Sequence, residues 1–274
     1  MMRQECTLPV FMYHRIATLL FSEDTAGLAV SPDQFECQMR YMHDRGFHCL
    51  SLKEVVNHWR SRTNSRLGKA FVLTFDDGFE DFYTTAWPIL ARYGFTATIF
   101  PVVGSIGRRS AWHGQDGTQA AQLMSWEQLG ELARSGIDVG SHTLTHPRLS
   151  TLDPAQAADE LRHSKQELED RLGQAVTLFS YPYSDRSTLV QRLADESGYH
   201  AACSDDRGRW GLFNIWRIQC GRDDRAEVFA LKVAGWYGRM TWLREETPLG
   251  RLLRRGVQRL KHLPSRPAPS PGET

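Results

Sequence analysis

The stretch AFVLTFDDGFEDF, residues 70–82, is the starting point for the fold. Its first six residues, 70–75, form a short apolar run that predicts a buried strand. Two adjacent carboxylates, Asp76 and Asp77, follow this run, and Gly78 comes after them. An Asp-Gly pair is common in surface turns, so two explanations stay open for this stretch alone: a polar turn, or acidic groups placed at a strand end for chemistry.

The same alternation of a short apolar run with an amphipathic helix recurs along the chain. Strand and helix alternate seven or eight times, which predicts an α/β fold with a parallel sheet, close to a (β/α) barrel. In such barrels the catalytic residues lie at the carboxyl ends of the strands. Residues 104–124 are expected to form a long loop. Strands are expected at 8–13, 47–50, 70–75, 95–103, 137–141, 175–181, 199–204 and 213–220, and helices at 31–45, 51–59, 80–93, 125–136, 153–172, 187–197 and 225–237.

The composition excludes several classes of protein. The chain has 274 residues, 41% hydrophobic and 24% charged, which suits a soluble globular protein with a sizeable core. The net charge of +1 gives no reason to expect binding to nucleic acid. The five cysteines are odd in number and contain no CxxC pair, so we expect free thiols rather than disulfides or a cysteine zinc site.

The location of the protein is predicted from the first residues. MMRQECTLPV, residues 1–10, has no long apolar segment and does not read as a signal peptide, and no run in the chain approaches a transmembrane length. We therefore expect a cytoplasmic protein.

Histidines lie at or after the ends of other expected strands. IDVGSHTLTH, residues 137–146, carries His142 and His146, and FMYHRI, residues 11–16, carries His14. Two histidines four residues apart suit one metal ion, and two histidines with one carboxylate form a common catalytic metal set. A second carboxylate beside the ligand would then accept protons from water whose pKa the metal lowers. This chemistry requires two adjacent acids with different roles.

These residues give the chain a family resemblance. TFDDG (74–78), SHTLTH (141–146) and FSYPYSD (179–185), in this order and at this separation, resemble three motifs of the polysaccharide deacetylase family, carbohydrate esterase family 4. The resemblance spans roughly residues 8–235. It implies a distorted (β/α) barrel of about seven strands and a bound divalent metal, zinc being the usual one.

The resemblance also implies roles for single residues. Asp77, His142 and His146 would be the metal ligands, and Asp76 would be the base that activates the attacking water. The loop of Tyr181, Pro182 and Tyr183 would bind substrate, with the backbone N–H of Tyr183 holding the oxyanion.

The sequence departs from the family pattern in two places. Many members have an Arg two residues before the Pro of the third motif, where this chain has Ser180, so Arg217 is the candidate for the missing cation. The usual carboxyl-terminal Leu-x-Leu-His motif, which carries the catalytic acid, is not evident. A branch of the family has the equivalent histidine on its first strand, so His14 is assigned as general acid. A structural His14 and a purely ion-paired Arg217 are the alternatives.

The implied reaction is removal of an N-acetyl group from an N-acetylated saccharide or a lipid-linked saccharide in polysaccharide biosynthesis. A deformylase, an O-acetyl esterase and a catalytically weak carbohydrate-binding homologue are the alternatives. Residues 1–245 are expected to form the catalytic domain, and 246–274 a basic amphipathic helix with a Pro-rich disordered tail. The basic helix suits either peripheral contact with the inner face of the membrane or a solvated terminus.

Overall fold

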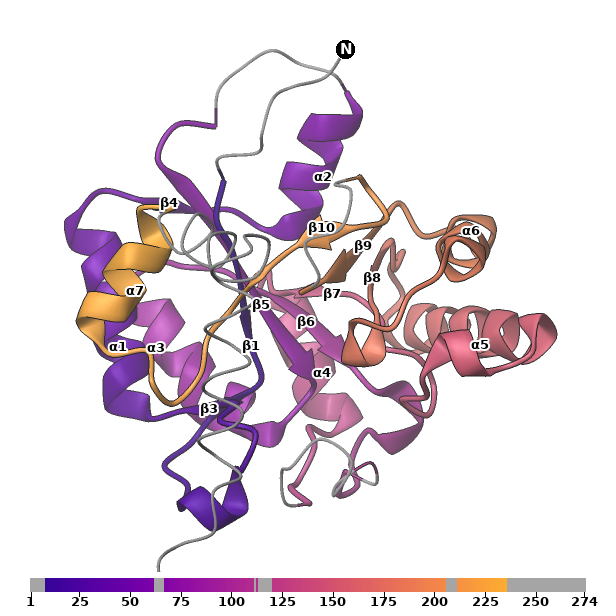
Figure 1. Cartoon of the computed structure of the whole chain (residues 1–274), viewed down its shortest axis with the longest axis horizontal. Coiled ribbons are helices and arrows are strands. Elements are labelled where there is room, and N and C mark those ends of the chain that lie inside the picture. The colour runs from indigo at the N-terminus through magenta and orange to yellow at the C-terminus, as the bar shows by residue number, and fades with distance from the viewer. Residues whose placement is uncertain (1–7, 62–66, 111, 113–119, 206–210, 236–274) are drawn as a thin grey trace, which may run out of the picture. The chain divides into compact units, whose positions relative to one another are not determined.

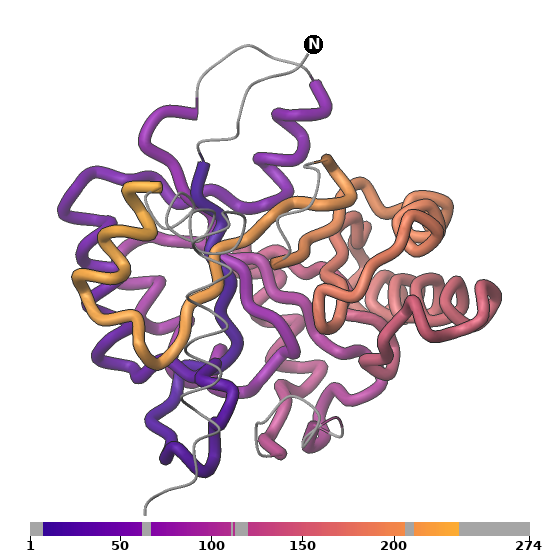
Figure 2. Tube along the Cα trace, viewed as in Figure 1, coloured from indigo at the N-terminus to yellow at the C-terminus, as the bar shows by residue number. Residues whose placement is uncertain are grey.

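The computed structural model describes residues 8–61, 67–110, 112, 120–205 and 211–235, and its trace can be followed in Figure 2. Strands and helices alternate through this part of the chain, as expected for an α/β fold. The strands are β1 (Val10–Tyr13), β2 (Arg15–Ile16), β3 (Ala29–Val30), β4 (His48–Cys49), β5 (Ala70–Asp77), β6 (Thr98–Pro101), β7 (Asp138–Val139), β8 (Leu178–Ser180), β9 (Ala201–Ser204), β10 (Ile215–Trp216) and β11 (Ile218–Gln219). The α-helices are α1 (Pro32–Asp44), α2 (Leu52–Arg60), α3 (Trp87–Arg92), α4 (Trp126–Arg134), α5 (Pro154–Leu172), α6 (Thr188–Glu196) and α7 (Ala226–Val233).

The central strands form a distorted barrel in which every ladder between described strands is parallel. One sheet has the order β11-β1-β5-β6-β7, and a second has the order β10-β9-β8. Figure 1 shows α1, α3, α4, α5 and α6 outside these strands. Such crossover helices are what allow neighbouring strands to run parallel. The fold class predicted from the sequence is confirmed.

Two irregular junctions join the sheets into a ring. A parallel bridge between Ser141 and Phe179 connects the end of β7 to β8. The second junction corrects the sequence prediction, because the segment 213–220 is not one strand but two. β10 pairs with β9 and β11 pairs with β1, and Arg217 lies between them. The last strand therefore leaves one sheet and joins the other at Arg217.

The interior of the barrel is filled by apolar side chains at one end. Val10, Val72 and Phe100 from three strands pack with Val55 and Val56 of α2, all almost fully buried. Helix α2 begins with a capping box in which the side chains of Ser51 and Glu54 each accept from the other's backbone N–H. Because α2 fills the end where the strands begin, side chains at the carboxyl ends of the strands are the ones left to form a site.

Strand β5 is longer than the sequence predicts. It runs from Ala70 to Asp77, all eight residues are buried, and Asp76 and Asp77 still pair with Phe100 and Pro101 of β6. The helix expected at 80–93 is helical from Glu80 to Arg92 but contains a π-helical turn, η2 (Phe82–Ala86), before α3. The expected strand 95–103 is shorter in the structure and consists of β6 alone. The described residues also include the 3-10 turns η1 (Phe21–Glu23), η3 (Val103–Ser105), η4 (Leu149–Thr151) and η5 (Pro182–Ser184).

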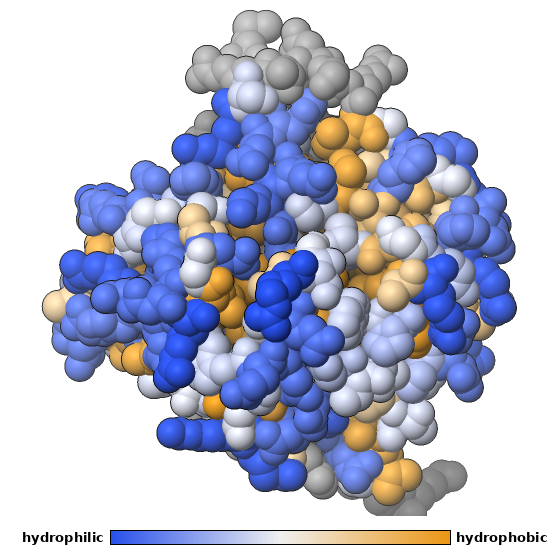
Figure 3. All heavy atoms as spheres, turned by 180° about the vertical axis from the view of Figure 1, so that it is seen from behind, coloured by the Kyte–Doolittle hydropathy of each residue, from blue (hydrophilic) through white to orange (hydrophobic). Residues whose placement is uncertain are grey.

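The remaining features of the structure concern its surface, its cysteines and the carboxyl-terminal segment. The face in Figure 3 is mostly hydrophilic, with apolar patches interrupted by polar residues. No helix within the described ranges is long and apolar enough to cross a membrane. The cysteines described are free thiols, at positions 37, 49, 203 and 220. The predicted basic helix and Pro-rich tail, 246–274, lie outside the described residues.

Candidate active site

A cavity of about 310 Å³ lies at the carboxyl ends of the barrel strands. Its polar lining comes from the ends of β1, β5 and β9, from the loops after β7 and β8, and from the β10–β11 segment, so segments far apart in the sequence meet there. Three acidic residues, three histidines and two arginines face the same space. These are Asp76, Asp77, Asp205, His14, His142, His146, Arg148 and Arg217.

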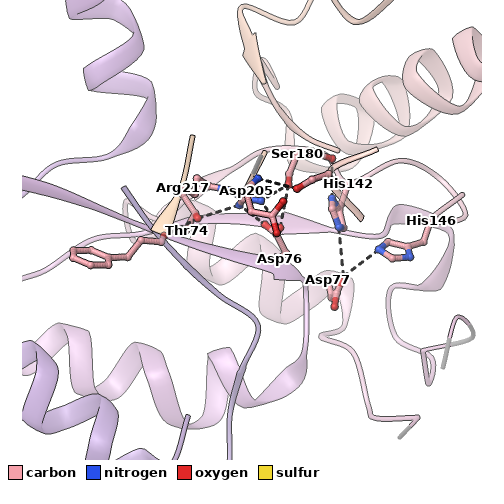
Figure 4. Close-up of polar contacts among 10 residues, drawn as sticks. Thr74, Asp76, Asp77, His142, His146, Ser180, Asp205 and Arg217 are labelled. Carbon is pink, nitrogen blue, oxygen red and sulfur yellow. Dashed lines mark hydrogen bonds and ion pairs between the residues drawn. The ribbon is translucent and has the colours of Figure 1, made fainter. Parts of the chain in front are cut away.

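Asp77, His142 and His146 form a compact cluster on one side of the cavity (Figure 4). The Nε2 atoms of both histidines lie 3.5 Å from Oδ1 of Asp77, and one ligand atom from each residue lies within 4.8 Å of the others. All three side chains are at most 5% exposed. The arrangement has the donor types, spacing and burial of a three-ligand site for a divalent metal.

The protonation of His142 shows that this cluster fits a cation. Its Nδ1 lies 2.8 Å from the carbonyl oxygen of Ser180, which can only accept, so Nδ1 carries the proton. Burial lowers the pKa of His142 to about 4, so the ring is neutral at pH 7 and Nε2 presents a lone pair to Asp77. A lone pair and a carboxylate oxygen that converge in a buried space are unfavourable alone, and a metal ion between them would satisfy both.

Asp76 lies beside this cluster in a different environment. Arg217 donates from Nη1 to Oδ1 at 2.7 Å and from Nη2 to Oδ2 at 2.6 Å, a bidentate pair. The Ser180 hydroxyl donates to Oδ2 at 3.1 Å. Burial opposes ionisation of Asp76, but the guanidinium outweighs it and holds the pKa of this carboxyl well below its usual range. Asp76 is therefore ionised at neutral pH.

Arg217 is itself fixed in place. Besides Asp76, the guanidinium donates to Thr74 Oγ1 at 3.1 Å and to Ser180 Oγ at 2.9 Å, and the residue is 1% exposed. Ser180 is the position at which the family resemblance led us to expect an arginine. In this chain the small hydroxyl there leaves room for a guanidinium that reaches the same carboxylate from the junction of β10 and β11. The sequence pointed to Arg217 as a candidate, and the structure places it in contact with Asp76.

Backbone strain is concentrated around the cavity. Among the described residues other than glycine, positive φ angles occur only at Asp77, Thr143, His146, Tyr183 and Ser184. All five are at the strand ends or in the loops that form the site. Such conformations persist only where surrounding contacts impose them, and they gather at functional sites. At Asp77 the φ of 70° interrupts the regular alternation of the strand, so the two neighbouring aspartates both contribute to the cavity.

Of the four other residues predicted for the site, three line the cavity and one does not. His14 follows β1 and lines the cavity, close enough for its charge to act on Asp76. Tyr183, with a φ of 57°, also lines it. Tyr181 lines it but is 1% exposed, with its hydroxyl donating to the carbonyl of Phe213 at 3.2 Å. Pro182 is buried and is not among the lining residues.

Two further residues hold the histidine loop, and sequence reasoning gave neither this role. Trp112 is 6% exposed and stacks on the His146 ring at 4.6 Å between centroids. Glu160 of α5 accepts from the backbone N–H groups of Leu144 and Thr145 at 2.8 and 2.9 Å. Nothing in the spacing of an amphipathic helix indicates a contact with a loop fifteen residues earlier, so Glu160 could not be found from the sequence.

Comparison with known proteins assigns the family. The model of the polysaccharide deacetylase family matches residues 63–202, which hold both aspartates and both histidines. The chain belongs to the polysaccharide deacetylase family. YxkH of Bacillus subtilis, which carries the name polysaccharide deacetylase, is 31% identical over 226 residues, covering 80% of this chain and 74% of the relative.

Other members of the polysaccharide deacetylase family share the sequence or the fold. The poly-β-1,6-N-acetyl-D-glucosamine N-deacetylase of Staphylococcus aureus is 25% identical over 211 residues, 68% of this chain and 69% of its own. The solved structure of the deacetylase PplD from Streptococcus pyogenes, in complex with acetate, superposes with a TM-score of 0.71 at 28% identity. That match covers 82% of this chain and 97% of PplD.

Proposed function

We propose that this polysaccharide deacetylase removes N-acetyl groups from N-acetylated sugar units by metal-assisted hydrolysis. The proposal rests on one observation: Asp76 and Asp77 are adjacent and line the same cavity, but they have different surroundings. Oδ1 of Asp77 lies 3.5 Å from Nε2 of both His142 and His146, whereas the adjacent Asp76 is bound by Arg217. Two neighbouring acids with different surroundings suit two different roles, a metal ligand and a proton acceptor.

Asp77, His142 and His146 would hold a divalent ion, for which zinc is the first candidate because it prefers imidazole and carboxylate ligands in this number. When bound, such an ion supplies a Lewis acid that polarises a carbonyl and lowers the pKa of water. The family is metal-dependent, and zinc is the metal that we propose for this chain.

The chain's own residues would carry the proton transfers. Asp76, kept ionised by Arg217, would accept the proton of the water that attacks the acetamide carbonyl. The backbone N–H of Tyr183 would donate to the oxygen that becomes negative as the tetrahedral centre forms. His14, just after the end of the neighbouring strand β1, would give a proton to the departing nitrogen. Acetate and a free amine would result.

The substrate is proposed from relatives and from the size of the cavity. The S. aureus relative is named for poly-β-1,6-N-acetyl-D-glucosamine, which makes a polymer of N-acetylated sugars the first substrate to test. A volume of about 310 Å³ is of the size that holds one sugar unit. A lipid-linked saccharide at the inner face of the membrane is the second candidate, in line with the expected cytoplasmic location.

Metal content and acetate release test this function together. The wild-type protein should hold about one divalent ion and release acetate from N-acetylglucosamine oligomers. His142→Ala should lose the metal, whereas Asp76→Asn should keep the metal and lose acetate release. His163→Ala, at an exposed position of α5, is the matched control and should keep both.

Two results would contradict the proposal. A wild-type protein that takes up no divalent ion under any loading condition would exclude the hydrolase and favour a carbohydrate-binding protein. Bound metal with release of formate, or of acetate without a new amine, would identify a deformylase or an O-acetyl esterase instead.

A further inference from the structure

Arg148 is a charged residue of the cavity that the proposed reaction does not use. It lies two residues after His146 and lines the cavity together with the catalytic groups. Its backbone carbonyl accepts from the N–H and the hydroxyl of Thr151 at 3.0 and 2.7 Å, which fixes the start of η4. The residue is exposed, so it lies at the mouth of the cavity rather than at its base.

The guanidinium of Arg148 is ordered without an acidic partner. It lies over the ring of Tyr183, 4.3 Å from the centroid, and the same ring meets His146 edge-on at 4.6 Å. No acidic side chain within the described ranges forms an ion pair with Arg148. A stacked guanidinium keeps its hydrogen-bonding edge available, because aromatic contact uses only its face.

The acidic residues of the cavity are directed elsewhere. Asp76 is bound by Arg217, and Asp77 faces the two histidines. Asp205 also lines the cavity, but its charge acts on Arg217, beside which it lies in Figure 4. The positive charge of Arg148 is therefore left for a group that comes from outside the protein.

We propose that Arg148 binds an anionic group of the substrate, a carboxylate or a phosphate carried next to the N-acetylated unit that reacts. The inference rests on the proposed function, since it names a further property of the same substrate. A planar guanidinium pairs with two oxygens of a carboxylate or phosphate at once, and stacking on Tyr183 reduces the freedom that binding must remove. A carboxylate would come from an acidic sugar in the polymer, and a phosphate from a glycosyl phosphate.

Affinity measured on matched pairs of ligands tests this assignment without requiring turnover. The first pair is an oligosaccharide of alternating glucuronate and N-acetylglucosamine, and the same oligosaccharide after reduction of its carboxylates to alcohols. The second pair is N-acetylglucosamine 1-phosphate and methyl N-acetylglucosaminide. Dissociation constants would be measured by calorimetry in the Asp76→Asn background, which prevents hydrolysis, with Arg148 intact, Arg148→Gln or Arg148→Lys.

The expected result is a change in the ratio of the two dissociation constants within a pair. With Arg148 intact, the charged member of at least one pair should bind about tenfold more tightly than the neutral member, the effect of one charge-assisted hydrogen-bonded pair at a partly exposed site. Arg148→Gln should bring the ratio close to one, and Arg148→Lys should give an intermediate value. Arg162→Gln, which removes an exposed arginine of α5, should leave the ratio unchanged.

The pair that responds identifies the source of the charge. A ratio of one in both pairs with Arg148 intact would overturn the assignment, and so would a ratio that survives Arg148→Gln. Equal weakening of charged and neutral ligands by Arg148→Gln would show that Arg148 only holds Tyr183. Because these are binding measurements, they can fail while wild-type protein still releases acetate, and the reverse also holds.

Discussion

Arg217→Gln is the substitution whose consequences follow most directly from the structure. It removes the cation from a carboxylate whose side chain is only 4% exposed and deletes the hydrogen bonds to Thr74 and Ser180. Breaking a buried ion pair by removing one partner lowers the free energy of unfolding by about 3–5 kcal/mol, because the remaining charge is buried without compensation. We expect a loss in that range at pH 8, measured by urea denaturation.

The stability lost in Arg217→Gln should be larger at high pH than at low pH. In the wild-type protein the folded-state pKa of Asp76 is lower than the unfolded value of about 4, so this carboxylate stabilises the fold above that value and the contribution disappears as the pH falls further. Without the guanidinium, burial raises the pKa of Asp76 above its unfolded value. The variant can then bind a proton on Asp76 as the pH falls, so the difference from wild type should be smaller at pH 5 than at pH 8.

A double variant separates a buried charge from lost packing. Asp76→Asn combined with Arg217→Gln leaves no charge uncompensated, so it should be more stable at pH 8 than Arg217→Gln alone. Arg192→Gln, which breaks an exposed pair with Glu196 on α6, should change stability little. An equal loss at both pH values, or a double variant no more stable than the single one, would refute this account of Arg217.

Three further predictions concern other parts of the site. Glu160→Gln should weaken zinc affinity about tenfold in a competition titration, since it loosens the loop before His146. Asp185→Asn removes a similar contact to Ser150 and should leave zinc affinity unchanged. Equal effects of the two substitutions would contradict this role of Glu160. Gly78→Ala should lower the melting temperature by several degrees, because its Cβ would lie 2.9 Å from that of Pro101 at a φ of +80°; an unchanged melting curve would count against the strain. His14→Gln should reduce kcat for acetate release by about 10²-fold with little change in metal content, and a loss of metal instead would assign His14 a structural role.

The sequence was sufficient for the fold class and for most of the site. Strand β5 is buried on both faces, so it reads as a continuous apolar run, and the residues after it fall at the barrel's carboxyl edge. The spacing of His142 and His146 predicted metal ligands, and the structure brings both histidines together with Asp77 in a group that could hold one ion. These features are local in the sequence, and local patterns are what periodicity and motifs can report.

What the sequence could not supply depends on contacts between distant segments. For Arg217 the sequence left two roles open, the cation beside the proposed base or a purely structural ion pair. The structure places its guanidinium on Asp76, a contact between residues 141 positions apart. The division of 213–220 into two strands has no signal in a run of apolar residues. The positive φ at Asp77 could not be predicted either, because aspartate rarely adopts it unless surrounding structure compels it.

The division of the last strand at Arg217 would link folding to the proposed catalysis. Arg217, which pairs with the proposed base Asp76, lies where the chain passes from pairing with β9 to pairing with β1 and completes the ring. Without that strand Asp76 would have no guanidinium, and burial would raise its pKa and favour the protonated form, which cannot accept a proton. If Asp76 is the base, a partly closed barrel would not activate water even with Asp77, His142 and His146 already together. Acetate release would then report whether the barrel has closed.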